Sequence, residues 1–187
     1  MEKNFDTAIT WVFHDEGGFA IRENEPMGGG NKGVSMLVFT EWRRKQNLPD
    51  PTFDDLKNLT DDEAKEIYRS NFANVISFDL LPSGVDYTVL NISVMQGPTG
   101  AKRILQESIG HPITGKLDDD DWDFIHKSDP YKLVAGLLLL QAKMKMNDPR
   151  VGPWKDSKGK DEKGFGPGWG NRIWRVWNRA TGLMEGQ

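Results

Sequence analysis

The stretch His14–Phe19 (His14-Asp15-Glu16-Gly17-Gly18-Phe19) decides how this chain begins to fold, because it closes an amphipathic helix predicted from about Phe5. At about 100° per residue, one arc of that helix is apolar and carries Phe5, Ile9, Val12 and Phe13. Glu16 projects into the middle of this arc. The two glycines that follow stop the helix, since glycine adopts the left-handed C′ conformation at little cost and leaves little bulk over the neighbouring surface.

Glu16 is therefore the first candidate functional residue. A carboxyl on the buried side of a helix loses hydration, which favours its protonated form. We expect a carboxylic acid set in an apolar wall beside an open, glycine-lined groove, the arrangement that a general acid needs near neutral pH. The plainer interpretation, which stays open, is a half-exposed glutamate near a helix end that pairs with an arginine.

The composition is typical of a soluble globular protein. The 187 residues suffice for one domain or two small lobes, with 37% hydrophobic and 28% charged residues. A net charge of −4 gives no reason to expect a nucleic-acid partner, which needs a basic face. There is no cysteine, and His14, His111 and His126 lie far apart, so we expect neither a disulfide nor a metal site.

The N-terminus lacks the basic and long apolar regions of a signal peptide. The most apolar run, Leu133–Ala142, is too short to span a bilayer, so no direct membrane insertion is expected. We therefore expect synthesis as a soluble cytoplasmic chain, with any action outside the membrane depending on release by another factor.

The remaining sequence predicts a mainly α-helical fold. Residues 17–34 are rich in glycine and have neither a helix nor a strand period, which indicates a loop or small hairpin of the kind that often carries a site. Capping and proline signals, such as the capping box at Thr60–Glu63, place helices at 35–46, 52–59, 61–72, 84–96, 98–109, 118–127, 130–146 and 169–183. Helix 130–146 is apolar on most sides and is expected at the centre of the core. Residues 148–168 form a predicted loop.

Two loops look like ligand-binding motifs but lack residues that those motifs require. Gly28–Gly33 lacks the GK[ST] order of a phosphate loop, and Asp118–Asp121 lacks the glycine and glutamate of a calcium-binding EF-hand. No cofactor is therefore expected.

Two motifs near the start of the chain resemble a known enzyme family. Glu16-Gly17-Gly18-Phe19, followed by a loop that ends in Gly33-Val34-Ser35, is similar to the EGGY…YGI[TS] signature of the glycoside hydrolase family 108 lysozymes, and the spacing matches without a gap. That family includes phage endolysins and proteins once labelled secretion activators. Ile67–Phe72 and Leu81-Pro82 resemble later parts of the same module.

The second half of the chain resembles the peptidoglycan-binding segment that usually follows this module. Asn91–Pro98 is similar to its "VN.GP" turn, Gly115–Leu117 stands at the place of a short turn, and Phe165–Arg172 resembles its closing "GW.NR" helix. The resemblance implies a lysozyme-like catalytic part over residues 1–83 and a helical peptidoglycan-binding part over residues 84–187, packed together as one globule.

The resemblance also implies cleavage of the β-1,4 bond between N-acetylmuramic acid and N-acetylglucosamine. Glu16 matches the family's catalytic glutamate and would be the general acid. Glu25 stands where members commonly carry an aspartate and is the expected second carboxylate, with Glu23 as a rival. Asn31 falls where related phage-type lysozymes hold a small polar residue that positions water.

Four further residues are expected to bind substrate: Gly17, Gly18, Phe19 and Lys32. The sequence departs from the family pattern at three positions, because Glu25 is one methylene longer than aspartate, Lys32 replaces an aromatic residue and Gly30 replaces a polar one. All three concern the water-activating half of the site. A carboxyl separation of about 6.5–9.5 Å implies inversion and about 5–5.5 Å implies retention, and the resemblance to phage-type lysozymes favours inversion.

The sequence thus predicts an N-acetylmuramidase, or lysozyme, of the phage or prophage endolysin kind. It would act as a monomer on bacterial peptidoglycan strands in the periplasm after holin-type release. Two alternatives stay open. A peptidoglycan-binding or virion structural protein with a degenerate site would bind cell wall without hydrolysis, and a regulator acting through protein contacts would have a protein partner and no affinity for the wall.

Overall fold

The computed structural model describes residues 4–21, 29–147, 154–155, 161–162 and 167–186. The chain divides between Val75 and Ile76 into two compact units, the N-terminal unit (Glu2–Val75) and the C-terminal unit (Ile76–Gln187). The boundary predicted after residue 83 lies beyond this division, because the 3₁₀-helix η3 (Phe78–Leu80) packs on the helix that follows it.

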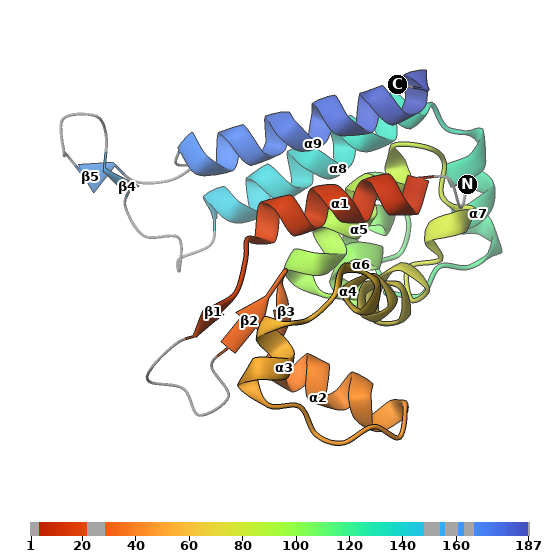
Figure 1. The fold of residues 1–187 in the computed structure, drawn as a ribbon. Coiled ribbons are helices and arrows are strands. Elements are labelled where there is room, and N and C mark those ends of the chain that lie inside the picture. The colour runs from red at the N-terminus through yellow and green to blue at the C-terminus, as the bar shows by residue number, and fades with distance from the viewer. Residues whose placement is uncertain (1–3, 22–28, 148–153, 156–160, 163–166, 187) are drawn as a thin grey trace. The chain divides into compact units, whose positions relative to one another are not determined.

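The N-terminal unit combines short helices with one small antiparallel sheet (Figure 1). Its elements are α1 (Phe5–Glu16), β1 (Ala20–Ile21), β2 (Gly29–Asn31), β3 (Val34–Ser35), α2 (Met36–Lys45), α3 (Phe53–Lys57), α4 (Asp61–Tyr68) and the π-helix η2 (Arg69–Ala73). The strands pair in the order β1–β2–β3, with Ala20 opposite Gly30 and Asn31 opposite Val34. The predicted small hairpin after the first helix is confirmed, and a third strand extends it.

Side-chain caps begin α2, α3 and α4. Thr52 and Thr60 each accept a hydrogen bond from the backbone N–H three residues on, and Asp55 and Glu63 reach back to complete two capping boxes. The hydroxyl of Ser35 accepts in the same way at the start of α2. These caps satisfy N–H groups that a helix start leaves without intrahelical partners. The capping box predicted at Thr60 is therefore confirmed.

An aromatic cluster fixes the end of α4 beside α1. The buried side chains of α1 lie on the predicted apolar arc or next to it: Phe5, Ala8, Ile9 and Val12. Phe13 meets Tyr68 edge-on with 5.7 Å between ring centroids, and Phe72 stacks on Tyr68 at 5.3 Å. The guanidinium group of Arg69 lies 4.6 Å from the centre of the Phe5 ring. Tyr68 is thus held from two sides by other rings.

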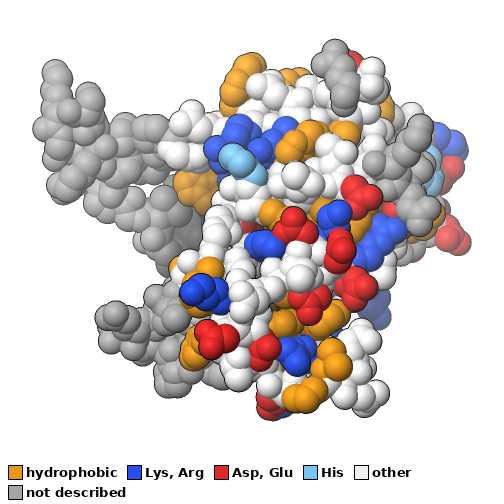
Figure 2. Space-filling view, viewed as in Figure 1, with side chains coloured by type: hydrophobic (Ala, Val, Ile, Leu, Met, Phe, Trp, Pro, Cys, Tyr) orange, Lys and Arg blue, Asp and Glu red, His pale blue; other side chains and the backbone are white. Residues whose placement is uncertain are grey.

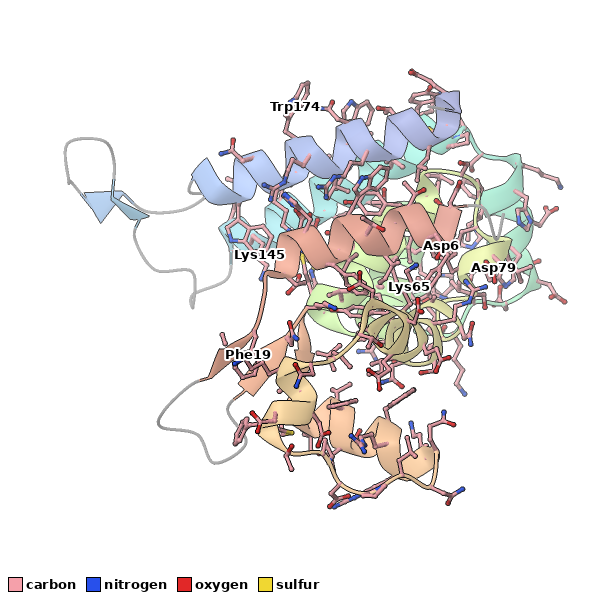
Figure 3. The ribbon with its side chains drawn as sticks, viewed as in Figure 1. Asp6, Phe19, Lys65, Asp79, Lys145 and Trp174 are labelled. Carbon is pink, nitrogen blue, oxygen red and sulfur yellow. The ribbon has the colours of Figure 1, made fainter. Side chains whose placement is uncertain are left out.

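A surface ion pair also joins α1 to α4. Nζ of Lys65 lies 3.2 Å from Oδ1 of Asp6, and Figure 3 labels both residues. Acidic and basic side chains are mixed on this face of the molecule (Figure 2). Because Asp6 is largely exposed, such a pair contributes less than about 1 kcal/mol. Packing of the aromatic cluster is the stronger link between the two helices.

The C-terminal unit is built around one buried helix, α5 (Val85–Gln96). Every residue of α5 from Val85 to Ser93 is buried, and α6 (Pro98–Ser108), α8 (Pro130–Met146) and α9 (Pro167–Glu185) pack on it. The prediction that α8 is the central helix is wrong. Its apolar residues are spread around the helix more widely than its contacts with α5, α6 and α9 reach, and Leu139 is 71% exposed. In Figure 1, α8 and α9 lie side by side.

The remaining elements of this unit are α7 (Asp119–Lys127) and the strand pair β4 (Trp154–Lys155) and β5 (Asp161–Glu162). Apart from these strands, most of the loop predicted at 148–168 lies outside the described residues. The predicted mainly α-helical fold is confirmed. Among the helices described, none combines the length and the apolar character that a bilayer crossing requires.

Candidate active site

Glu16 is the last residue of α1, and its side chain is exposed. The predicted apolar wall around this carboxyl is therefore wrong. The helical period does put Glu16 on the same arc as Val12, but it lies one turn beyond that last buried residue, at the tip of the helix. Gly17 ends α1 with a φ of +80°, and its N–H donates to the carbonyl of Phe13 at 3.2 Å. The sequence correctly predicts the stop but not the surroundings of the acid.

The stem of Glu16 rests against the β2–β3 turn, which we define as Asn31–Val34. A Cβ at Gly33 would lie 2.9 Å from Cγ and 3.0 Å from Cβ of Glu16, and it would overlap the hydroxyl of Tyr68. Gly33 also has a φ of +76°, a conformation that side chains with a Cβ rarely adopt. Two independent reasons therefore require glycine at this position, which is the first residue of the Gly33-Val34-Ser35 motif.

Tyr68 links this turn to the end of α4. The side chain is buried, and its hydroxyl donates to the backbone carbonyl of Lys32 at 3.0 Å. Burial raises the pKa of Tyr68 well above its ordinary value, and the negative charge of Glu16 raises it further. The phenol therefore remains neutral, and remains a hydrogen-bond donor, throughout the neutral pH range. The stem of Glu16 and the hydroxyl of Tyr68 both lie against Gly33.

Asn31 is buried on β2 and bonds to the end of α3. Its Nδ2 donates to the carbonyl of Leu56 at 3.0 Å and to the carbonyl of Lys57 at 3.1 Å. These carbonyls belong to the last turn of a helix, where carbonyl groups lack intrahelical partners. Since a side-chain amide has two donor hydrogens, both are engaged here. The predicted role of Asn31 in positioning water stays a prediction, and only its carbonyl oxygen could serve it.

Lys32 directs its ammonium group to protein acceptors. Nζ donates to the carbonyl of Leu59 at 2.9 Å and lies 2.5 Å from Oδ1 of Asp61, at the start of α4. The hydrogen bond from Lys32, followed by the attraction of its charge, holds the pKa of Asp61 below its ordinary value. Lys32 itself adopts a φ of +51°. Its predicted part in substrate binding stays untested, and the geometry gives it a structural task.

The other predicted site residues lie around α1 and β1 or outside the described part. A Cβ at Gly17 or Gly18 would meet nothing within 4 Å, in agreement with the predicted lack of bulk beside Glu16. Phe19 is half-buried, and Figure 3 labels it next to β1. Glu25 and its rival Glu23 lie outside the described residues. In the ranges that the structure describes, no three His, Cys, Asp or Glu side chains are grouped as metal ligands.

Sequence reasoning did not assign a role to Tyr68. The residue is part of the Ile67–Phe72 stretch that carries the resemblance, but nothing in its position along the chain predicts contact with residues 36 positions away. An aromatic residue near the end of a helix is more often part of a core. The buried hydroxyl, which needs a partner, is the signal that points to a further task.

Residues 9–97 match the family described as glycosyl hydrolase 108. The matched segment begins in α1, ends directly after α5, and includes Glu16, the β2–β3 turn and Tyr68. This segment belongs to glycosyl hydrolase family 108. A solved structure of SagA from Brucella abortus is similar over 98% of this chain and 97% of that one, with 26% identity and a TM-score of 0.77. No curated protein matches the chain significantly.

The family 108 segment indicates a glycoside hydrolase of the lysozyme-like, peptidoglycan-cleaving class. The predicted lysozyme-like helical fold is confirmed as well. The family 108 segment extends through α5, the central helix of the C-terminal unit, and the predicted domain boundary after residue 83 stays a prediction.

The C-terminal unit contains a second polar cluster, centred on Asp121. Oδ1 of this buried carboxylate accepts from Nδ1 of His111 at 2.8 Å, and Oδ2 accepts from Nε2 of Gln106 at 2.8 Å and from the backbone N–H of Asp118 at 3.1 Å. Burial alone would raise the pKa of Asp121, but the hydrogen bonds from Gln106, Asp118 and His111 together lower it. This cluster joins the start of α7 to α6.

The same unit has an apolar pocket of about 430 Å³ between α8 and α9. Trp174, Trp177 and Leu139 are among its lining residues, and Trp174 is 64% exposed and projects from α9 in Figure 3. The lining contains no ionisable side chain, so this pocket offers no group for acid–base chemistry.

Proposed function

We propose that the chain is an N-acetylmuramidase that cleaves the β-1,4 bond between N-acetylmuramic acid and N-acetylglucosamine in bacterial peptidoglycan. Glu16 is its general acid. The observation that carries the proposal is the place of this residue: Glu16 lies within the family 108 segment, is exposed at the tip of α1, and has its stem packed against a turn that is tied to two other helices.

This placement suits an acid that acts on a polymeric substrate. A glycosidic oxygen leaves readily only when an acid protonates it as the bond breaks, and a second carboxylate must stabilise the positive charge on the sugar or activate water. An exposed acid can reach a polymeric substrate, and a fixed stem limits the directions in which it can deliver the proton. Glu25 is the proposed second carboxylate, with inversion at the anomeric carbon.

The biological role that we propose is that of a phage or prophage endolysin. The protein would act as a monomer, need no cofactor, and reach the periplasmic cell wall after holin-type release. This part of the proposal is supported by the family and by the sequence features described above, and it depends on the hydrolytic activity.

The decisive experiment is digestion of purified peptidoglycan by the wild type, Glu16→Gln and Glu41→Gln, with mass analysis of the reduced fragments. Glu41→Gln is the matched control, because it makes the same change at an exposed position on α2 of the same unit. We expect fragments that end in reduced N-acetylmuramic acid from the wild type and the control. Glu16→Gln should lower the rate about 10²–10⁴-fold, the usual contribution of a general acid.

Other results would contradict the proposal in distinct ways. Fragments that end in reduced N-acetylglucosamine would show that the enzyme cleaves the other glycosidic bond of the glycan. Unchanged activity of Glu16→Gln would show that Glu16 is not the general acid. Intact glycan with retained sedimentation on cell wall would favour the wall-binding alternative. Digestion by Glu25→Gln and Glu23→Gln identifies the second carboxylate, and the anomer released first, read by NMR, decides between inversion and retention.

A further inference from the structure

We propose that Tyr68 is a positioning residue for the general acid: its hydroxyl holds the β2–β3 turn against the stem of Glu16 and thereby sets the direction of the carboxyl group. The inference rests on the proposed function for its catalytic consequence. Its structural content concerns three segments of the N-terminal unit, which are the end of α1, the β2–β3 turn and the end of α4, and it can be measured without any substrate.

These segments meet at Gly33. The end of α1 contributes the Cβ and Cγ of Glu16, the end of α4 contributes the hydroxyl of Tyr68, and both lie where a Cβ of residue 33 would be. The glycine therefore works as a contact point between two side chains rather than as a flexible link. A shift of this turn would remove one wall from the stem of Glu16 and leave its side-chain torsions less restricted.

Three ties hold the β2–β3 turn, and they act on different atoms. Asn31 ties β2 to the last carbonyls of α3, and the ammonium group of Lys32 ties the turn to Leu59 and Asp61. Both of these ties act through side chains. Tyr68 instead binds the backbone carbonyl of Lys32, in the peptide unit that leads directly into Gly33. It is thus the tie that acts on the part of the turn in contact with Glu16.

Tyr68 is itself held firmly enough to act as a fixed point. Its side chain is buried, with Phe13 edge-on and Phe72 stacked on the ring. The chain continues from Tyr68 directly into the π-helix η2, a rare geometry that is frequent at functional sites. Because the Tyr68 ring is confined in this way, it cannot move together with the turn. The hydrogen bond from its hydroxyl therefore holds the turn in one position.

The protonation state of Tyr68 suits this task. A phenol donates a hydrogen bond to a carbonyl only while it is neutral. Burial and the charge of Glu16 raise the pKa of Tyr68, so the bond to Lys32 persists over the whole range in which peptidoglycan would be cleaved.

The test compares Tyr68→Phe with Tyr131→Phe. The first keeps the ring and its packing and removes only the bond to Lys32, and the second makes the same change at an exposed tyrosine of the C-terminal unit, whose hydroxyl bonds to Glu185. We expect Tyr68→Phe to lower kcat on peptidoglycan fragments about tenfold with KM within about twofold, since misplacement of a catalytic group by 1 Å costs up to about 10²-fold. Tyr131→Phe should match the wild type.

A second measurement follows the position of Glu16 without substrate. The ¹³C resonance of its side-chain carboxyl, assigned by its loss in Glu16→Gln, should move in Tyr68→Phe together with the amide resonances of Lys32 and Gly33. It should stay in place in Tyr131→Phe. Phe72→Leu, which keeps the hydroxyl but removes the stacked ring, should give smaller changes in the same direction and serves if Tyr68→Phe does not fold.

The outcomes separate the two proposals. A folded Tyr68→Phe with unchanged kcat and unchanged resonances overturns the positioning role, whatever the activity of the wild type. A loss of activity that follows only the loss of folded protein, and disappears well below the melting temperature, also overturns it. If the wild type cleaves no peptidoglycan, the proposed muramidase function fails, and the resonances alone decide whether Tyr68 positions Glu16.

Discussion

Two polar clusters in the described part of the chain differ in how far their hydrogen bonds cover a carboxylate. Around Asp121 the carboxylate is buried, and the amide of Gln106 both donates to it and accepts from the backbone N–H groups of Thr114 and Gly115. Around the β2–β3 turn the bonds of Asn31 and Tyr68 also end on the protein, but Glu16, whose stem contacts the same turn, is exposed.

This difference separates a structural network from a candidate site. In the first cluster the carboxylate of Asp121 accepts hydrogen bonds from its neighbours, and these bonds lower its pKa so that it stays ionised. In the second, Asn31, Lys32 and Tyr68 bond to backbone carbonyls and form a frame around Gly33, and the exposed side chain of Glu16 lies beside this frame. A reactive group needs both access and fixed geometry, which the second arrangement combines.

The largest effect on stability and activity is expected at Gly33, the contact point of the frame. Gly33→Ala should destabilise the N-terminal unit by roughly 2–5 kcal/mol, the sum of a positive φ for a non-glycine residue and of overpacking against Tyr68 and Glu16. It should also abolish peptidoglycan cleavage. The measurements are urea unfolding and product analysis.

Gly110→Ala provides the control, because Gly110 has a similar φ of +73° but open space around it. It should cost only about 1–2 kcal/mol, the conformational part alone, and should leave cleavage intact. Equal effects of the two substitutions would show that crowding at Gly33 is unimportant and that the frame has no special contact point.

A smaller effect is expected from the structural network. Asp121→Ala removes the buried acceptor of three hydrogen bonds, those from Gln106, His111 and the backbone N–H of Asp118, and should cost roughly 2–3 kcal/mol. Because the folded-state pKa of Asp121 is lowered, its contribution is fully present above the unfolded value near about 4 and is lost as pH falls through the lower folded value. The stability difference between the two proteins should therefore shrink below about pH 4.

Thermal unfolding from pH 3 to pH 7 measures this difference. Cleavage by Asp121→Ala, assayed well below its melting temperature, should equal that of the wild type. A pH-independent difference would mean that the charge of Asp121 contributes nothing, and a selective loss of kcat would remove the distinction between the two clusters.

The sequence predicts local features of this fold well. Helix starts depend on residues within one turn, so the capping box of Thr60 with Glu63 could be found without a structure. The stop at Gly17 depends on one residue in the same way. Which helix is buried is not a local feature. Both α5 and α8 are rich in apolar residues, and only the packing of other helices decides that α5 is the central one.

The sequence alone suggests an acid for the candidate site, but it does not predict the residues that pack around that acid. The resemblance identifies Glu16, whereas its exposure depends on where α1 ends relative to its neighbours. Asn31 bonds to a carbonyl 25 residues away and Lys32 to one 27 residues away, and neither partner has a recognisable sequence signal because any residue supplies a carbonyl. The contact made by Tyr68 could not be predicted from the sequence for the same reason.

The smallest effect on stability is expected at Asp61, at the outer edge of the frame. Asp61→Asn removes the charge that faces Lys32, but Asp61 is 69% exposed and the ammonium group keeps its bond to the carbonyl of Leu59. An exposed ion pair contributes about 0–1 kcal/mol and weakens with salt, so the loss should be below about 1 kcal/mol at low salt and should vanish at about 1 M salt. Urea unfolding at both salt concentrations measures it. A loss of several kcal/mol that salt does not reduce would show that Asp61 supports the β2–β3 turn as strongly as the buried bonds do, and the frame would then extend to the surface.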